Sequence, residues 1–187
     1  MRVIVQRSKN SKVTIDGKVN GQIDSGFVLL VGFTEGDNEK IIDKMINKII
    51  NLRIFEDENE KMNKSILDVG GSILSISQFT LYANCSEGRR PSFVEALNPT
   101  EATKLYDLFN KKLSEFIHVE TGIFGADMKV EIYNDGPVTI VLDSEEVIDL
   151  NKVTEASRII NKIMDENESL LEDADELDIF SKEKGDK

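Results

Sequence analysis

The stretch MKVEIYNDGPVTIVLDS, residues 128–144, decides how the end of the folded domain is organised. Apolar and polar residues alternate on both sides of its centre, and a period of two is typical of a half-buried strand. The centre reads Asn134-Asp135-Gly136-Pro137. Asp-Gly is a common hairpin turn, but the Pro that follows cannot donate a hydrogen bond to a neighbouring strand. The stretch therefore predicts two strand segments around a turn whose Gly-Pro pair needs an explanation.

Earlier parts of the chain predict more strands. Residues 3–7, 12–15 and 18–23 have strand character, and Asp16-Gly17 is a hairpin signal between the last two. The apolar run FVLLVGF at 27–33 is typical of a strand covered on both faces. Residues 72–82, SILSISQFTLY, form a long strand candidate.

Two helices are predicted between and after these strands. Asp37 is a candidate N-cap for a helix with a broad apolar stripe from Ile41 to Ile50. The run Asn98-Pro99-Thr100-Glu101 is a strong helix start, and this second helix is expected to end near His118. Its inward residues are predicted to be Leu105, Leu108, Phe109, Leu113 and Phe116.

Composition and charge set the domain organisation. The chain has 187 residues and a net charge of −12, and residues 145–187 carry −8 of that charge with fourteen acids and six bases. We therefore predict a domain at 1–147 and an acidic C-terminal extension at 148–187, beginning with an amphipathic helix and continuing as a mobile tail. The extension is either a solubilising tail or a partner-docking helix. A domain so close to neutral is not a broad phosphate-binding surface.

Several classes of protein are disfavoured. Apolar residues make up 40% of the chain, yet no run of about eighteen exists to span a membrane. The single cysteine fits a reducing compartment, with the cytosol as the default. One histidine excludes a multi-histidine metal site, and His118 is expected to be structural at its helix end. Cys85 has no histidine close in sequence to activate it, so we interpret it as a free loop cysteine.

Two stretches remain as candidates for chemistry. In SISQFTLY, residues 75–82, polar residues interrupt a strand, and a half-exposed strand is the ordinary explanation. Ser77 and Thr80 would face opposite sides of a regular strand, so serving one site requires a turn near Gln78. The other stretch is Gly136-Pro137. X-Pro bonds are cis in about 5–6% of cases in folded proteins, and the sequence leaves cis and trans open.

Four motifs together resemble the D-aminoacyl-tRNA deacylase family: SQFTLYA at 77–83, GRRPSF at 88–93, TGIFGADM at 121–128 and NDGPVT at 134–139. The opening MRVIVQR and the strand GFVLLVGF are also similar, so the resemblance covers about residues 1–144. Several motifs in the same order and spacing make the resemblance specific.

The resemblance implies a cytoplasmic proofreading hydrolase without cofactor or metal. Its substrate would be a tRNA 3′ end that carries a D-amino acid, or glycine mischarged on alanine tRNA. It implies a homodimer with active sites at the subunit interface. The family's Gly-cisPro signature maps to Gly136-Pro137, whose carbonyl oxygens would enter the partner's pocket, hold the α-amino group and leave no room for an L side chain.

The resemblance also assigns a catalytic segment, Ser77-Gln78-Phe79-Thr80. Backbone N–H groups around Gln78 and Phe79 would stabilise the oxyanion while the 2′-hydroxyl of the terminal ribose assists. Ser77 and Thr80 would shape the site and make polar contacts, and Phe79 would pack beside the adenosine. Thr80 carries a nucleophile's hydroxyl but has no base to activate it.

The remaining site residues in this interpretation bind substrate. Phe124, Ala126 and Met128 are expected to line the pocket. Arg7 either braces the Gly-Pro loop from a neighbouring strand or makes an ordinary surface ion pair.

Two alternatives stay open. One is a hydrolase on the same scaffold that removes an L-amino acid, which would be expected to lack the Gly-Pro pair. The other is a non-catalytic RNA-associated binding module, which would be expected to have a broken SQFT or GPVT motif. For the fold, we predict a single α+β domain with a curved, mostly antiparallel, barrel-like sheet packed with two main helices.

Overall fold

The computed structural model describes residues 1–147, and the predicted extension at 148–187 lies outside them. The elements are β1 (Arg2–Ile15), β2 (Lys18–Gly32), α1 (Glu39–Ile50), β3 (Phe55–Glu56), β4 (Met62–Lys64), β5 (Ser72–Ser77), the 3-10 helix η1 (Phe79–Tyr82), α2 (Pro99–Leu113), β6 (Val119–Thr121), β7 (Lys129–Glu131), β8 (Asn134–Asp143) and α3 (Ser144–Val147). No helix within residues 1–147 has the length and apolar character to cross a membrane.

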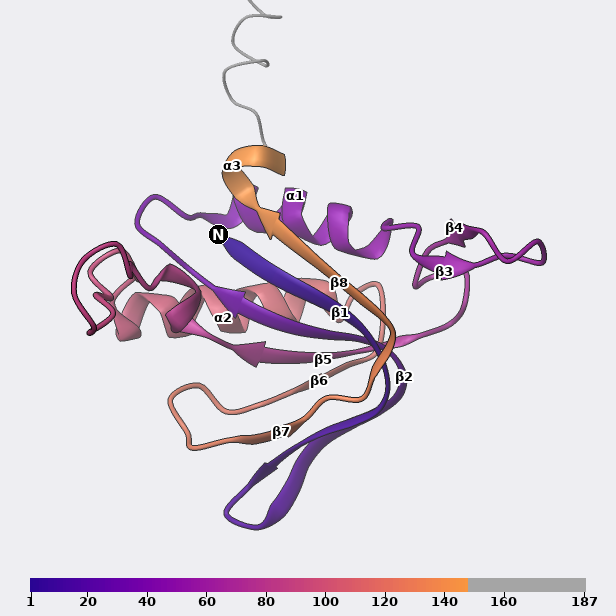
Figure 1. Cartoon of the computed structure of the whole chain (residues 1–187), viewed down its shortest axis with the longest axis horizontal. Helices are drawn as coiled ribbons and strands as arrows, with labels where there is room; N and C mark the ends of the chain where they lie inside the picture. The colour runs from indigo at the N-terminus through magenta and orange to yellow at the C-terminus, as the bar shows by residue number, and fades with distance from the viewer. Residues whose placement is uncertain (148–187) are drawn as a thin grey trace, which may run out of the picture. The chain divides into compact units, whose positions relative to one another are not determined.

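The main sheet has the order β6-β5-β2-β1-β7, and β8 pairs with the same edge of β1 as β7 (Figure 1). β1 is antiparallel to β2, β7 and β8, whereas β5 is parallel to both β2 and β6. The predicted α+β domain with a curved, mostly antiparallel sheet and two main helices is confirmed. The barrel-like part of that prediction is too strong, because β6 and β7 at the sheet's two ends are not paired with each other in the described residues.

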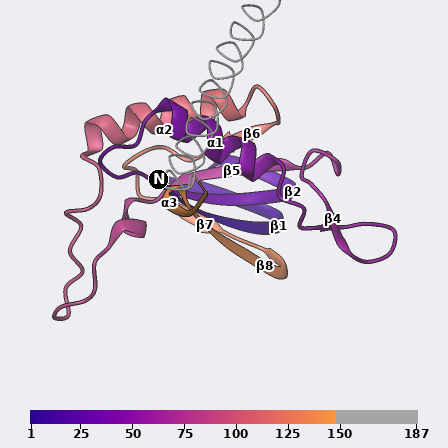
Figure 2. The same ribbon diagram turned by 90° about the horizontal axis from the view of Figure 1, so that it is seen from above.

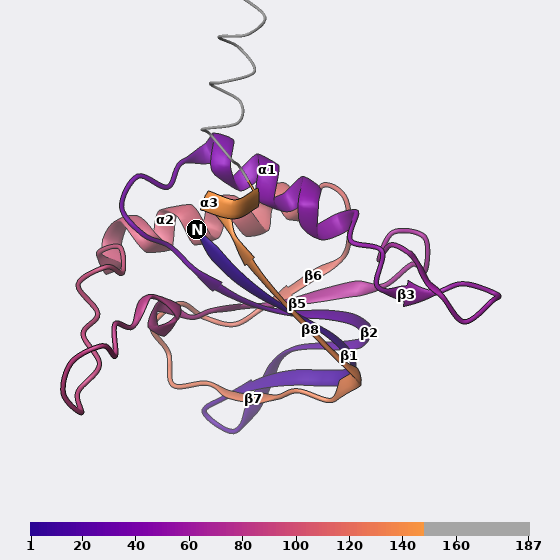
Figure 3. The ribbon, with the colours of Figure 1, turned by 45° about the horizontal axis from the view of Figure 1, so that its top comes forward.

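One long hairpin, β1–β2, replaces the separate strands predicted at the start of the chain (Figure 3). Its turn is Asp16-Gly17, where both residues have positive φ (48° and 72°) and Ile15 pairs with Lys18. This is the two-residue turn geometry that matches the twist of antiparallel strands. The hairpin signal is therefore confirmed, while the breaks predicted within each strand are wrong.

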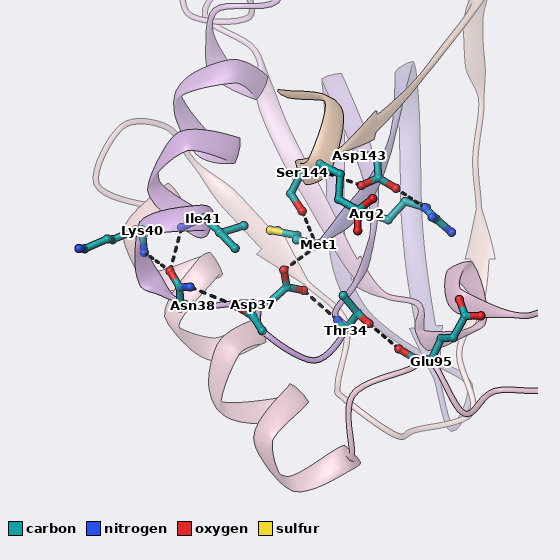
Figure 4. A network of polar contacts seen from close by, with 12 residues as sticks. Met1, Arg2, Thr34, Asp37, Asn38, Lys40, Ile41, Glu95, Asp143 and Ser144 are labelled. Atoms are coloured by element: carbon teal, nitrogen blue, oxygen red, sulfur yellow. Dashed lines mark hydrogen bonds and ion pairs between the residues drawn. The ribbon is translucent and has the colours of Figure 1, made fainter. Parts of the chain in front are cut away.

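The residue that caps α1 is Asn38, not Asp37. The Asn38 side chain accepts hydrogen bonds from the N–H groups of Lys40 and Ile41 (Figure 4). Asp37 is occupied by other partners: its carboxylate lies 2.6 Å from the Met1 ammonium group and accepts the Thr34 N–H at 2.8 Å. A buried charge needs a partner, and here Asp37 serves the chain's own amino group.

The second helix begins as predicted and ends earlier. Asn98 caps α2 by accepting the Glu101 N–H, with Pro99 in the first turn. The helix stops at Leu113 because the chain then turns into β6, which pairs with β5. Phe116, predicted to point inward, is 56% exposed.

Apolar side chains pack on both faces of the sheet. Phe27, Leu29 and Val31 of β2 pack toward α1 and α2, which cover one face (Figure 2). Val28 belongs to a second, smaller cluster on the other face, together with Val13, Ile23, Leu74 and Ile76. The strand at 27–33 is therefore covered on both faces, as its continuous apolar run predicts.

The two segments around Gly136-Pro137 do not form a hairpin. β7 and β8 lie one after the other along β1, with Val13 opposite Val130 and Val5 opposite Ile140. The pairs Gln6–Thr139 and Ser8–Asn134 are separated by two positions along β1 but by five positions along β8. The extra residues leave the strand as a bulge, and Gly136-Pro137 lies in it.

Candidate active site

The backbone turns at Gln78. Ser77 and Thr80 need such a turn between them if both are to serve one site. β5 ends at Ser77, and Gln78 (φ −147°, ψ 83°) leads into η1. The Gln78 N–H donates to the Val31 carbonyl at 2.7 Å, which fixes the turn on β2. Gly32 permits this approach, because a Cβ there would lie 2.9 Å from the Gln78 carbonyl oxygen and 3.2 Å from Leu81 Cβ.

A pocket of about 300 Å³ opens beside this turn. Ile76, Ser77, Gln78 and Phe79 line one side, and Phe124 to Met128 and Val130 line the other. The Phe79 ring is 54% exposed and meets Phe93 edge-on, with ring centroids 5.1 Å apart. The pocket mouth therefore presents an exposed aromatic pair, which suits a flat ring of a ligand.

The loop opposite the turn is held by close packing. Gly122 donates its N–H to the Ser75 carbonyl at 3.0 Å, and a Cβ on Gly122 would collide with Met128 Sδ. The Tyr106 hydroxyl donates to the same Ser75 carbonyl at 2.8 Å, and its ring lies 6.1 Å from that of Phe124. Burial raises the pKa of Tyr106, so the phenol keeps its proton and remains a donor.

The structure brings together six of the predicted site residues, namely Ser77, Gln78, Phe79, Phe124, Ala126 and Met128. Thr80 does not line the pocket, but its hydroxyl accepts a hydrogen bond from the Gln78 side-chain amide. Sequence reasoning missed Ile76, Gly125, Asp127 and Val130, although Gly125 and Asp127 stand within the quoted TGIFGADM motif. Asp127 is paired with Lys129 at 3.0 Å.

Gly136 and Pro137 do not line this pocket in their own subunit. Both are exposed, the peptide bond between them is cis, and Gly136 has φ +129°. Arg7 also lies away from the pocket.

Arg7 braces the Gly-Pro loop. The side chain is buried, with its Nε donating to the Asp135 carbonyl at 3.0 Å and its Nη1 donating to the Ile54 carbonyl at 2.7 Å. From the other end of the loop, Asn134 Oδ1 accepts the Val138 N–H at 3.1 Å. Arg7 also pairs with the Asp135 carboxylate, with 3.8 Å between Nε and Oδ2, but at 7% exposed it is a buried residue and not a surface one.

Neither a histidine nor a cysteine lines this pocket. His118 is exposed, with its Nε2 2.9 Å from Glu120 Oε1. Its predicted place at the end of α2 is wrong, because α2 ends at Leu113. Cys85 is exposed in a loop. Within residues 1–147, no three His, Cys, Asp or Glu residues are grouped to hold a metal ion. Polar chemistry in the pocket is thus confined to backbone groups, the Ser77 hydroxyl, the Gln78 amide and the Asp127 carboxylate.

A larger hollow, of about 780 Å³, lies between residues 34–37 and 94–98. It contains none of the predicted site residues. Glu35, Glu95, Glu101 and Glu145 line it, opposed by Arg2. Such a lining repels a nucleic acid, so this hollow is a poor candidate for an RNA end.

Comparisons with known proteins agree with the motifs. The family model described as D-Tyr-tRNA(Tyr) deacylase matches residues 4–143. A D-aminoacyl-tRNA deacylase of Clostridium tetani is 57% identical over 148 residues, covering 79% of this chain and 99% of that protein. One of Thermus aquaticus is 54% identical over 147 residues, covering 78% of this chain and 97% of that protein.

Solved structures show the same fold. A protein titled c-Myc DNA Unwinding Element Binding Protein is 39% identical, with a TM-score of 0.73 over 76% of this chain and 98% of its own. A probable eukaryotic D-amino acid tRNA deacylase, 16% identical with a TM-score of 0.66 over the same shares, is similar in fold alone.

The family model and these relatives define a hydrolase that acts on aminoacyl-tRNA. The chain belongs to the D-aminoacyl-tRNA deacylase family.

Proposed function

We propose that Gly136-Pro137 of one subunit enters the pocket of a second copy of the chain and acts there as a chiral gate. The observation that carries this proposal is the position of the loop: it is exposed, braced by the buried Arg7, and away from its own pocket. The far edge of β8 has no partner strand among the described residues, and Val141 (60% exposed) lies on this strand. In a homodimer that covers this edge, each active site consists of the pocket of one subunit and the Gly136-Pro137 loop of the other.

Selection in this arrangement works by exclusion. The loop carbonyl oxygens hold the substrate's α-amino group, and the loop fills the space that an L side chain needs. A D side chain points into the remaining pocket between Phe79 and Met128. Glycine has no side chain to exclude, so glycine mischarged on alanine tRNA is also a substrate.

The chemistry needs no side-chain nucleophile. Thr80 lacks a base, and the one histidine lies outside the pocket. The 2′-hydroxyl of the terminal ribose assists attack on the ester, which is more reactive than an amide. The Gln78 N–H is already bonded to Val31, so the Phe79 N–H is the better oxyanion donor.

Recognition of the tRNA is confined to its end. Residues 1–144 carry a net charge of −4, which does not support a long phosphate-binding track. Arg89 and Arg90 are exposed in the 84–92 loop, which leads through Ser92 to Phe93 at the pocket mouth. A tRNA substrate places the enzyme in the cytoplasm. We assign this function to a domain at residues 1–147, with 148–187 as an acidic extension.

The proposal is tested by measuring hydrolysis of three esters: D-tyrosyl-tRNA, L-tyrosyl-tRNA and alanine tRNA mischarged with glycine. We expect the D and glycyl esters to be cleaved and the L ester to survive. A D-aminoacylated tRNA that ends in 2′-deoxyadenosine should be cleaved far more slowly. Cleavage of the L ester would favour a general editing hydrolase, and cleavage of none would favour a non-catalytic binding module.

A further inference from the structure

The Arg7 guanidinium joins two segments that are distant in sequence. It donates to the Asp135 carbonyl beside the Gly-Pro pair and to the Ile54 carbonyl in the segment after α1. Ile54 is 8% exposed, so its carbonyl is a fixed point in the core. The position of the guanidinium therefore depends on the segment at 54–55 as much as on the loop it braces.

Phe55 supports the guanidinium from a third direction. Its ring centroid lies 6.0 Å from Arg7 Cζ, at the outer limit of a cation–π contact. The same ring stacks on Phe27, with centroids 5.2 Å apart and planes 21° apart. Phe27 is fully buried, so the stack anchors the Phe55 ring to the core of the sheet.

The contact between Arg7 and the loop is close enough to transmit a displacement. A Cβ built on Gly136 would lie 3.1 Å from Arg7 Nη2, so the guanidinium packs directly against the loop backbone. A competing partner is near: Asp135 Oδ2 lies 3.8 Å from Arg7 Nε and 3.1 Å from Lys9 Nζ. A guanidinium without the Phe55 ring is free to exchange the Asp135 carbonyl for this carboxylate, which is the stronger acceptor.

We propose that Phe55 is a positioning residue for chiral selection: its ring fixes Arg7, and Arg7 fixes the Gly136-Pro137 loop. This inference rests on the proposed gate for its effect on catalysis. It assigns to the β3 segment, which contributes nothing to the pocket lining, a part in the choice between D and L substrates.

The test compares Phe55→Leu with two matched variants. Phe55→Tyr keeps the ring. Phe33→Leu truncates a buried aromatic of the core cluster against which Phe55 packs, and Phe33 makes no cation–π contact with Arg7 in the described residues. We expect Phe55→Leu to lower the ratio of D to L hydrolysis about tenfold, the equivalent of one cation–π contact. Phe55→Tyr should retain the ratio of D to L hydrolysis. Phe33→Leu should reduce thermal stability but leave that ratio unchanged.

A double-mutant cycle tests whether Phe55 acts on the loop through Arg7. If Phe55 acts through Arg7, Phe55→Leu should add no further loss of selectivity in an Arg7→Lys background. Independent losses that add up in the double variant would contradict the pathway. An unchanged ratio in Phe55→Leu, measured beside a wild type that discriminates, would overturn the proposal.

Hydrogen exchange separates this inference from the proposed gate. The Val138 N–H, which is bonded to Asn134, should exchange faster in Phe55→Leu, while amides of β2 keep their wild-type rates. Faster exchange in a protein that shows no chiral selectivity would support the positioning role and refute the gate. If the Val138 exchange rate and the ratio of D to L hydrolysis both stay unchanged in Phe55→Leu, the positioning role is refuted and the gate is not.

Discussion

Replacing Gly136 with alanine is the substitution that probes the gate most directly. Gly136 has φ +129°, a conformation that L residues rarely adopt. An added Cβ would also lie 2.9 Å from Val138 Cγ2 and 3.1 Å from Arg7 Nη2. Backbone strain of this kind costs about 1–3 kcal/mol, and the displaced neighbours add to it.

The expected result has two parts. A loss of about 2 kcal/mol in the free energy of unfolding lowers the melting temperature by about 4–8 °C for a domain of this size. Because the new methyl group presses on Arg7, the loop also moves, and hydrolysis of D-tyrosyl-tRNA should fall while that of L-tyrosyl-tRNA rises. Thermal unfolding followed by circular dichroism and single-turnover hydrolysis of both esters measure the two parts.

Gly70→Ala is the matched control. Gly70 also has a positive φ (+62°), but an added Cβ there meets nothing within 4 Å. This variant should lose about 1 kcal/mol of stability, the cost of placing an L residue in the left-handed region, and keep wild-type selectivity. Equal stability losses in the two variants, or unchanged selectivity in Gly136→Ala, would refute the reasoning.

Three further predictions concern stability and RNA binding. Asp37→Asn should lower the free energy of unfolding by about 3 kcal/mol, because the buried Met1 ammonium loses its charged partner, and chemical denaturation measures this. Burial opposes ionisation of Asp143, but the Glu145 N–H and the Arg2 guanidinium hold its pKa below the ordinary value. Its carboxylate therefore stabilises the fold above the unfolded pKa, and the stability difference between wild type and Asp143→Asn should shrink as the pH falls from about 5 to 3. The logarithm of kcat/KM for D-tyrosyl-tRNA should fall with the logarithm of salt concentration with a slope no steeper than about −2, the value for two phosphate contacts, and a slope beyond about −4 would contradict end-only recognition.

Local signals in the sequence predicted those parts of the fold that neighbouring residues determine. Asp16-Gly17 specified its hairpin turn, and Asn98-Pro99 specified the start of α2. The cap of α1 was missed by one residue because the competing partner of Asp37, the Met1 amino group, is distant in sequence.

The partner of a strand is not a local property, and here prediction from the sequence failed. Nothing in residues 128–144 shows that both segments pair with β1 and not with each other. The pocket residues were predicted from motifs, whereas their meeting depends on β5, whose end carries Ser77 and whose Ser75 carbonyl holds Gly122. Phe55 went unnoticed because its role depends on an arginine 48 positions earlier.

Subunit mixing tests most directly whether each site takes its pocket from one subunit and its gate from the other. The two parent proteins are a variant with a filled pocket, Ala126→Trp, and a variant with an altered gate, Gly136→Ala. If sites are shared, equal mixing with free exchange makes half of the dimers mixed, each with one intact site, and restores about a quarter of the wild-type D-tyrosyl-tRNA hydrolysis. Activity that stays at the average of the two parents, despite mixed dimers seen by native mass spectrometry, would contradict the shared site.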